Sequence, residues 1–174
     1  MSEILFIGPQ SSGKSLLLTR LKKLAQDHKI TPFDQMSKTA PTKGTENNNF
    51  IFRGVNFNFK ELGGESIADY AQHAESAKGV VYVFDSADFT TTATNIVYLN
   101  DLLTNENLET KPILIVLSKC DIPDRIKFSV IDSILTFDNM KNPDRIEYLE
   151  TSSVIGIGLN EIFQWVAELN SNMK

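Results

Sequence analysis

The sequence predicts an α/β fold built around a mostly parallel sheet. Three short apolar runs, Ile4–Ile7, Val80–Phe84 and Ile113–Leu117, lack polar alternation, and the last two are rich in β-branched residues. Such runs are typical of strands covered on both faces, as in parallel sheets. Segments with helical spacing lie between them, and strands that alternate with helices indicate βαβ units.

Three segments carry apolar residues at helical spacing, which predicts amphipathic helices packed on the sheet. The first, Lys14–Gln26, follows the first apolar run directly. The apolar positions are Leu17, Leu21 and Leu24 in the first segment, Ile96, Leu99 and Leu103 in the second, and Ile162, Trp165, Val166 and Leu169 in the third.

Residues Asn49–Glu61 break this alternation with two strand-like pieces around Gly54. Apolar and polar residues alternate in the second piece, which indicates one buried face. We therefore expect an antiparallel hairpin attached to the sheet. The aromatic residues of this stretch lack the basic setting of a nucleic-acid surface, so hairpin packing explains them better. The polar segment Asp27–Pro41 has two prolines and no periodicity, which is typical of a mobile loop.

Length and charge limit the classes of function. The chain has 174 residues, which suits a single domain over residues 1–174, and its net charge is −5. A mildly acidic chain has no general attraction for DNA or RNA, so we expect no nucleic-acid partner. The single cysteine, Cys120, cannot form an intrachain disulfide, which favours a reducing, cytoplasmic setting.

The sequence offers no direct membrane anchor. No stretch approaches the roughly 20 apolar residues of a membrane-spanning helix. Residue 2 is serine, which excludes N-myristoylation, and Ser171–Lys174 is not a prenylation signal.

The most specific motif is Gly8–Ser15, which fits G-x-x-x-x-G-K-[ST]. The backbone N–H groups of such a loop surround phosphate oxygens, and its two glycines permit close approach. Lys14 supplies positive charge to the β and γ phosphates, and the Ser15 hydroxyl binds Mg²⁺ at the start of a helix. A chance match is less favoured because the motif follows a strand and opens a helix. The predicted phosphate-binding residues are Gly8, Gln10, Ser11, Ser12, Gly13, Lys14, Ser15 and Leu16.

A second motif, Ser118–Asp121, follows the third apolar run and predicts a guanine base. The Asp121 carboxylate can accept from the guanine N1–H and N2–H₂ groups, and the Lys119 stem can lie across the base. Backbone N–H groups of Thr151, Ser152 and Ser153 could donate to guanine O6. The alternative for Asp121 is a helix N-cap or turn residue. Its position after a strand favours the guanine-binding role over the cap or turn, since ligands bind at the carboxyl ends of such strands.

With these loops in this order, the chain resembles the Ras superfamily of small GTPases and, within it, the Arf-like branch. Pro41–Gly44 resembles the Pro-Thr-x-Gly of Arf switch I, and Glu61–Glu65 resembles the Asp-x-Gly-Gly-Gln of switch II. The resemblance spans Ile4 to Leu169. It implies the P-loop NTPase fold of small-GTPase type: a six-stranded, mostly parallel sheet with five helices on its two faces.

The resemblance also implies a switch that binds GDP or GTP with Mg²⁺ and recruits effectors in the GTP state. Thr42 would bind Mg²⁺ through its hydroxyl and the γ-phosphate through its N–H group, and the Gly64 N–H would also meet the γ-phosphate. The expected metal ligands are Ser15, Thr42 and Glu61. Effectors, exchange factors and GTPase-activating proteins would bind through Thr42–Glu65 and switch II.

Glu65 departs from the family pattern, because a glutamine usually orients the attacking water there. An ionised carboxylate offers only acceptors and adds negative charge beside the γ-phosphate. With Lys14 and Glu65 as the catalytic residues, we expect slow GTP hydrolysis, unless Glu65 faces solvent and other groups hold the water. The main alternative is a constitutively GTP-bound scaffold or complex subunit. An ATP-dependent kinase is a weaker alternative, because no lid or acceptor site is visible.

The sequence departs from the Arf pattern at three further places, and each departure leads to an expectation. Glu61 replaces the aspartate that usually meets Mg²⁺ through water, which predicts a rearranged magnesium contact. Ser118 replaces the asparagine that ties the base loop to the phosphate loop, so we expect faster nucleotide release. The first strand begins near residue 3, so we expect the amphipathic helix of Arf proteins to be missing. We expect a monomer that reaches membranes only through partners.

Overall fold

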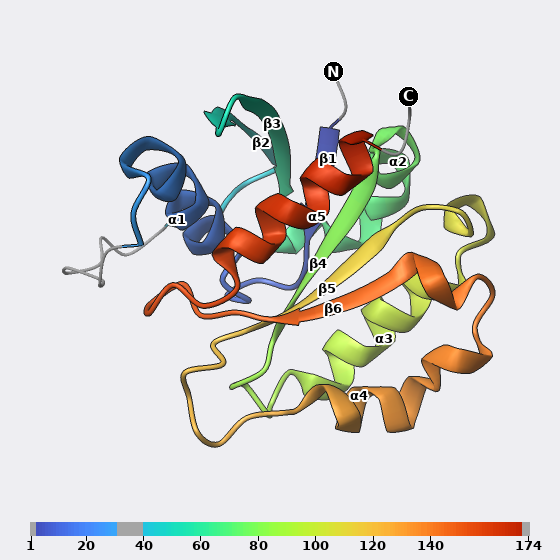
Figure 1. Cartoon of the computed structure of the whole chain (residues 1–174). Helices are drawn as coiled ribbons and strands as arrows, with labels where there is room; N and C mark the ends of the chain where they lie inside the picture. Colours follow the sequence, from blue (N-terminus) through green and yellow to red (C-terminus); the bar gives the residue numbers. More distant parts are fainter. Residues whose placement is uncertain (1–2, 31–39, 172–174) are drawn as a thin grey trace.

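The computed structural model describes residues 3–30 and 40–171. Six strands form one sheet in the order β2-β3-β1-β4-β5-β6 (Figure 1). β2 is antiparallel to β3, and every other neighbouring pair is parallel, which confirms the predicted mostly parallel sheet. The strands are β1 (Glu3–Ile7), β2 (Thr45–Phe52), β3 (Val55–Leu62), β4 (Gly79–Asp85), β5 (Ile113–Ser118) and β6 (Ile146–Glu150).

Helices cover both faces of the sheet, as expected (Figure 1). α1 and α5 pack on one face, and α2, α3 and α4 pack on the other. The helical spacing in the sequence located α1, α3 and α5. The helices are α1 (Lys14–Asp27), α2 (Tyr70–Ser76), α3 (Thr92–Thr104), α4 (Phe128–Leu135) and α5 (Leu159–Ser171).

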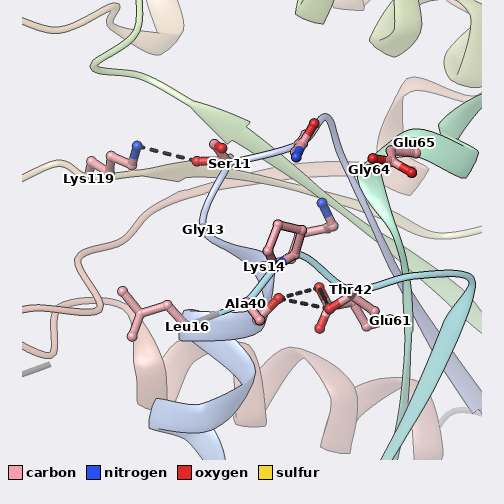
Figure 2. Close-up of a pocket in the computed structure, with 13 residues that line it drawn as sticks. Ser11, Gly13, Lys14, Leu16, Ala40, Thr42, Glu61, Gly64, Glu65 and Lys119 are labelled. Carbon is pink, nitrogen blue, oxygen red and sulfur yellow. Dashed lines mark hydrogen bonds between the residues drawn. The ribbon is translucent and has the colours of Figure 1, made fainter. Parts of the chain in front are cut away.

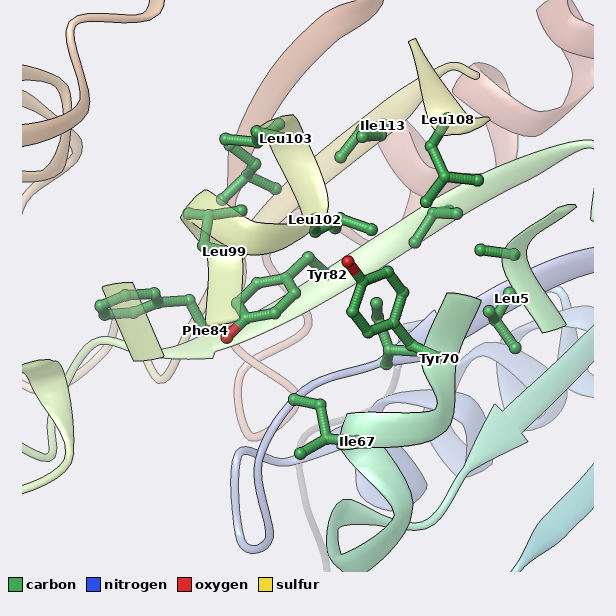
Figure 3. Packing of buried hydrophobic residues seen from close by; sticks show 14 of the residues in the cluster. Leu5, Ile67, Tyr70, Tyr82, Phe84, Leu99, Leu102, Leu103, Leu108 and Ile113 are labelled. Carbon is green, nitrogen blue, oxygen red and sulfur yellow. The ribbon is translucent and has the colours of Figure 1, made fainter. Parts of the chain in front are cut away.

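Adjacent residues of the central strands divide between two hydrophobic cores, because successive side chains of a strand point to opposite faces. In β1, Leu5 and Ile7 join the core under α2, α3 and α4, whereas Ile4 and Phe6 join the core under α1 and α5. Figure 3 shows the first core, in which Tyr82 is enclosed and its hydroxyl donates to a backbone carbonyl of α3. Burying each such side chain stabilises the fold by about 1.5–3 kcal/mol.

The β2–β3 hairpin forms as predicted, although β2 begins four residues earlier than the apolar pattern showed. Its first residues are polar because β2 is an edge strand, held by backbone pairing from Thr45 opposite Leu62. Arg53 and Gly54 both have positive φ, as a two-residue type I′ turn requires. The aromatic rings of the hairpin pack against Phe163 of α5, and the ring centroids of Phe52 and Phe163 are 4.3 Å apart. These aromatic residues therefore belong to a core.

The carboxyl ends of the parallel strands β1, β4, β5 and β6 meet at one edge of the sheet. Four loops leave these ends and include Gly8–Gly13, Ser86–Ala87, Lys119–Asp121 and Thr151–Ser153. Ligands of open α/β sheets bind at this edge. The predicted loop Asp27–Pro41 lies mostly outside the described residues, since 31–39 are not described. Within the described ranges, no helix combines the length and apolarity needed to cross a bilayer.

Candidate functional site

The loop between β1 and α1 is shaped by two glycines. A Cβ on Gly8 would lie 2.3 Å from the Val83 carbonyl oxygen of β4, so only glycine fits beside the neighbouring strand. Gly13 precedes the first residue of α1 with φ +98°, which favours glycine. The loop therefore wraps tightly and directs the N-terminus of α1 toward its concave side, where the helix dipole favours an anion.

The Lys14 side chain lies inside this loop. Its ammonium group donates to the carbonyl oxygens of Gly8 at 2.7 Å and Pro9 at 2.9 Å, and its side chain is buried. Burial lowers the pKa of Lys14 to about 8, against the opposing effect of the nearby Glu61 carboxylate. A buried ammonium at the centre of the loop is placed to neutralise bound phosphate.

Three side-chain oxygen atoms converge beside Lys14 from segments far apart in the sequence. The Ser15 hydroxyl donates to Glu61 Oε1 at 2.6 Å, and the Thr42 hydroxyl donates to the same oxygen at 3.2 Å. Ser15 Oγ and Thr42 Oγ1 are 3.1 Å apart. The structure thus brings together the three residues predicted as metal ligands. Two hydroxyls and a carboxylate are the hard oxygen donors that Mg²⁺ prefers, so the residues fit that ion.

Two glycines after β3 hold this cluster against the phosphate loop. A Cβ on Gly63 would lie 2.3 Å from the Thr42 carbonyl oxygen, and one on Gly64 would lie 2.3 Å from the Gln10 backbone nitrogen. The Gly63 N–H also donates to the Gly44 carbonyl at 2.7 Å. The glycine pair is therefore required by close backbone contact. The sequence showed Gly63 only as part of the switch II motif. Its role in holding switch I through Thr42 and Gly44 was not predicted.

These segments enclose a pocket of ≈270 Å³. Figure 2 shows Thr42 and Glu61 together on one side, Gly64 and Glu65 on another, and Lys119 at the opposite end. Glu65 lies on the rim in the 3₁₀ turn Gly64–Asp69, and its side chain is exposed. The lining residues are Gln10, Ser11, Gly13, Lys14, Ser15, Leu16, Ala40, Pro41, Thr42, Glu61, Gly64, Glu65 and Lys119.

The end of β5 is tied to the phosphate loop through Ser118. Its buried hydroxyl lies 2.7 Å from the Ser12 carbonyl oxygen and 3.1 Å from the Phe84 carbonyl oxygen, and it can donate to either. The sequence raised the concern that serine is too short for this tie. The structure shows that it reaches, but its single proton serves two acceptors.

Lys119 extends from this loop along the phosphate loop. Its ammonium group pairs with Asp85 Oδ2 at 2.5 Å and lies 3.4 Å from the Ser11 carbonyl oxygen. Asp85 is buried at the end of β4, and its other oxygen accepts from the Ala87 N–H at 3.0 Å. Sequence reasoning missed Asp85, although an acid directly after a buried strand, at the carboxyl edge, was a visible signal.

Ser86, also missed, completes the support of this loop. Its buried hydroxyl donates to the Ser118 carbonyl at 2.5 Å, and its own carbonyl accepts from the Ile126 N–H at 2.7 Å. The end of β4 therefore holds both the start of the base loop and the segment that follows it.

The loop after β6 is placed by backbone hydrogen bonds. The Thr151 N–H donates to the Leu117 carbonyl at 2.8 Å, and the Thr151 carbonyl accepts from the Cys120 N–H at 2.9 Å. The Ser152 N–H donates to the Ile157 carbonyl at 3.1 Å. Of the three predicted donors to guanine O6, two are thus already engaged. Among the described residues, only Ser153 of the three has an N–H group without a partner.

Asp121 lies beside this loop with its carboxylate free of hydrogen bonds within the described part of the chain. It does not cap a helix, because the residue that precedes α4 is Lys127. It does lie next to a turn, since the Ile122 N–H donates to the Lys119 carbonyl at 3.0 Å. The arrangement leaves both carboxylate oxygens available to a ligand.

Comparison with known proteins gives consistent matches over most of the chain. The sequence profile of the ADP-ribosylation factor family matches residues 1–170. The small COPII coat GTPase SAR1 of Giardia intestinalis is 28% identical, over 95% of this chain and 87% of that protein. ADP-ribosylation factor-like protein 2 of Arabidopsis thaliana is 26% identical, over 95% of this chain and 85% of that protein.

A solved structure has the same fold. It is the Arl6 (BBS3) small GTPase of Trypanosoma brucei with the nucleotide analogue GppNp bound, at a TM-score of 0.78. The match covers 99% of both chains at 18% sequence identity.

Proposed function

The chain belongs to the ADP-ribosylation factor family, and from that premise we propose that it is a guanine-nucleotide switch that binds GDP and GTP with Mg²⁺. The observation that carries this proposal is the convergence of Ser15, Thr42 and Glu61. These residues come from the phosphate loop, switch I and switch II. A ligand held at their meeting point links the conformation of both switches to the nucleotide.

The phosphate end of the site has defined roles. Lys14 neutralises the β and γ phosphates, and the backbone N–H groups of Gly8–Ser15 surround their oxygens. Mg²⁺ held by the oxygen cluster supplies positive charge to the same phosphates. Thr42 and Gly64 meet the γ-phosphate through their N–H groups. Because Gly63 contacts Thr42 and Gly64 contacts Gln10, loss of that phosphate releases both switches together.

The base end selects guanine. Asp121 accepts from N1–H and N2–H₂, and Ser153 donates its unpartnered N–H to O6. Lys119 lies along the base plane, held by Asp85. Adenine does not present this donor pair on the corresponding edge, so the free carboxylate of Asp121 would be left unpaired.

Hydrolysis is slow in this proposal. Glu65 takes the position of the usual glutamine. Its side chain is exposed, as the alternative for Glu65 requires, but it also lines the pocket beside Gly64, so its carboxylate still faces the γ-phosphate position. An ionised carboxylate there repels the γ-phosphate and cannot donate to it. This observation also favours the second candidate, a chain that stays bound to GTP and acts as a scaffold or complex subunit.

The proposal extends to the domain organisation, partners and cellular location of the chain. The chain acts as one domain over residues 1–174 and as a monomer. It binds effectors, exchange factors and activating proteins through Thr42–Glu65 and switch II. It works in the cytoplasm and reaches membranes through those partners.

The nucleotide that co-purifies with the protein tests the proposal and separates its two forms, the turning-over switch and the GTP-bound scaffold. Mass spectrometry of the nucleotide that co-purifies should find guanine nucleotides: mostly GDP supports a turning-over switch, and mostly GTP supports the scaffold. Adenine nucleotides or none, together with no binding of added GDP, would contradict both forms.

The Glu65→Gln variant tests the slow hydrolysis. We expect its single-turnover GTP hydrolysis to be about tenfold faster than that of the wild type, because glutamine can orient water. A Glu75→Gln variant in α2 is the control for removal of a nearby acid. A wild type as fast as Glu65→Gln would contradict the assigned role of Glu65.

A further inference from the structure

We infer that Glu61 binds Mg²⁺ directly and takes the place of the water through which the usual aspartate meets the ion. This inference rests on the proposed nucleotide and metal binding. It concerns one residue of this chain that differs from the family pattern. The Glu61 carboxylate would then be a third protein ligand beside Ser15 and Thr42.

The spacing of the three oxygens supports direct binding. Octahedral Mg²⁺ has ligands at 2.0–2.1 Å, so neighbouring ligand oxygens lie about 2.9 Å apart. The separations among Ser15 Oγ, Thr42 Oγ1 and Glu61 Oε1 are 2.6, 3.1 and 3.2 Å. The three atoms therefore already outline one triangular face of an octahedron.

The backbone of Glu61 is fixed, so the length of its side chain decides its reach. β3 pairs with β1 on one side, where Phe6 is opposite Glu61, and with β2 on the other, where Glu46 is opposite. Shortening Glu61 to aspartate withdraws the carboxylate by about 1.5 Å, which makes room for a water. The extra methylene therefore converts a water-mediated contact into a direct one.

The charge balance of the site also points to a cation at this oxygen. Glu61 is 2% exposed, and within the described residues its carboxylate forms no salt bridge. Its two hydrogen-bond partners are neutral hydroxyls, and the nearby Lys14 ammonium is directed to carbonyl oxygens. Lys14 therefore offsets the Glu61 charge only without direct contact, and a buried carboxylate without a directly paired cation is costly. A bound divalent ion supplies positive charge in direct contact with this oxygen.

The inference predicts how many waters remain on the metal. Mg²⁺ takes six ligands. In the triphosphate complex the β and γ phosphates supply two of them. With three protein oxygens, only one position is left for water, whereas a water-mediated acid leaves two.

The test counts these waters with Mn²⁺ as the probe, bound to the full chain together with a nonhydrolysable GTP analogue. Broadening of the Mn²⁺ electron paramagnetic resonance lines in ¹⁷O-labelled water reports the number of water ligands. We expect one water for the wild type and two for Glu61→Asp. Two waters in the wild type would overturn the inference. Because this result is obtained with the wild type, it does not depend on whether a variant folds.

Metal affinity gives a second readout. Nucleotide release is followed as free Mg²⁺ is lowered with a chelator, and Glu61→Asp should need about tenfold more Mg²⁺ to retain nucleotide. Glu161→Asp, which makes the same change at an exposed position of α5, is the matched control and should behave as the wild type. An unchanged Mg²⁺ requirement for Glu61→Asp would contradict the inference. If the wild type binds no guanine nucleotide at all, the proposed function fails instead.

Discussion

The two ends of the candidate site are built in different ways, and among the described residues the pocket reaches the base end only through Lys119. At the phosphate end, side chains from three distant segments converge on one point, as in the contacts of Ser15, Thr42 and Glu61. At the base end, backbone hydrogen bonds between Cys120, Thr151 and Leu117 fix the loops. The carboxylate of Asp121 is left free there. The phosphate end is thus held by side chains that also bind, whereas at the base end Asp121 takes no part in the hydrogen bonds that hold its loop.

This difference has a physical consequence. A substitution at the phosphate end changes the ligand contact and the packing of the switches together. A substitution at the base end can remove recognition alone, because the backbone keeps the loop in place. Ser118 connects the base loop to the phosphate loop through its contact with Ser12. Substitutions of Ser118 therefore test whether the two ends act independently.

Asp121→Ala should have the largest effect and should leave the fold intact. We expect GDP affinity to fall at least about 10³-fold, because the guanine donors lose their only charged acceptor. Calorimetry measures the affinity, and Asp124→Ala, which removes an exposed acid three residues away, is the control. Equal losses in both variants would contradict the separation of support from recognition.

Gly63→Ala should affect the switches more than the nucleotide itself. The new Cβ would lie 2.3 Å from the Thr42 carbonyl oxygen, so switch I must move away from the metal cluster. We expect affinity for a GTP analogue to fall about 100-fold and GDP affinity about tenfold or less. Ser66→Ala, in the same turn, should leave both affinities unchanged. A parallel loss for both nucleotides would show that Gly63 does not couple to the γ-phosphate.

Ser118→Ala tests the link between the ends. Loss of the buried hydrogen bond to Ser12 should speed GDP dissociation about tenfold. Ser118→Asn should slow it, but by a smaller factor, because serine already makes the contact. A fluorescent GDP analogue in a stopped-flow chase measures both rates. If neither substitution changes the off-rate, the tie does not control release.

The smallest effect is a proton taken up by Lys14. Its pKa of about 8 means that the free protein loses this charge as the pH rises through that value. Bound phosphate favours the charged form and raises the pKa, so binding above about pH 8 should take up a fraction of a proton. GDP affinity should therefore fall with rising pH. Calorimetry in two buffers of different ionisation enthalpy detects the uptake, and it should vanish in Lys14→Arg, which stays charged.

Most of the fold could be predicted because its determinants are local. The continuous apolar runs gave β1, β4 and β5, and helical spacing gave α1, α3 and α5. α2 has only Tyr70 and Ala74 as buried residues, too few for a periodic pattern. α4 is only 8 residues long, too short for a repeated helical pattern, and its apolar face includes exposed Val130 and Ile134 beside buried Ile131 and Leu135.

The site was predictable where a motif lies in one stretch of chain, and less so where partners are distant. Gly8–Ser15 and Ser118–Asp121 could be found from spacing alone. The ion pair of Lys119 with Asp85 depends on β4 and β5 being neighbours, which no local pattern states. The reach of Ser118 to Ser12 and the contact of Gly63 with Thr42 likewise depend on tertiary packing, in which a difference of a few tenths of an ångström decides whether a contact forms.

The central claim is that the base loops of the site recognise guanine, while the phosphate loop binds any phosphate chain. Calorimetric titration of nucleotide-free protein with GDP and with ADP, both in magnesium, tests it most directly. We expect tight binding of GDP and binding of ADP weaker by at least about 10³-fold. Equal affinity for the two nucleotides, or no binding of either, would contradict the account.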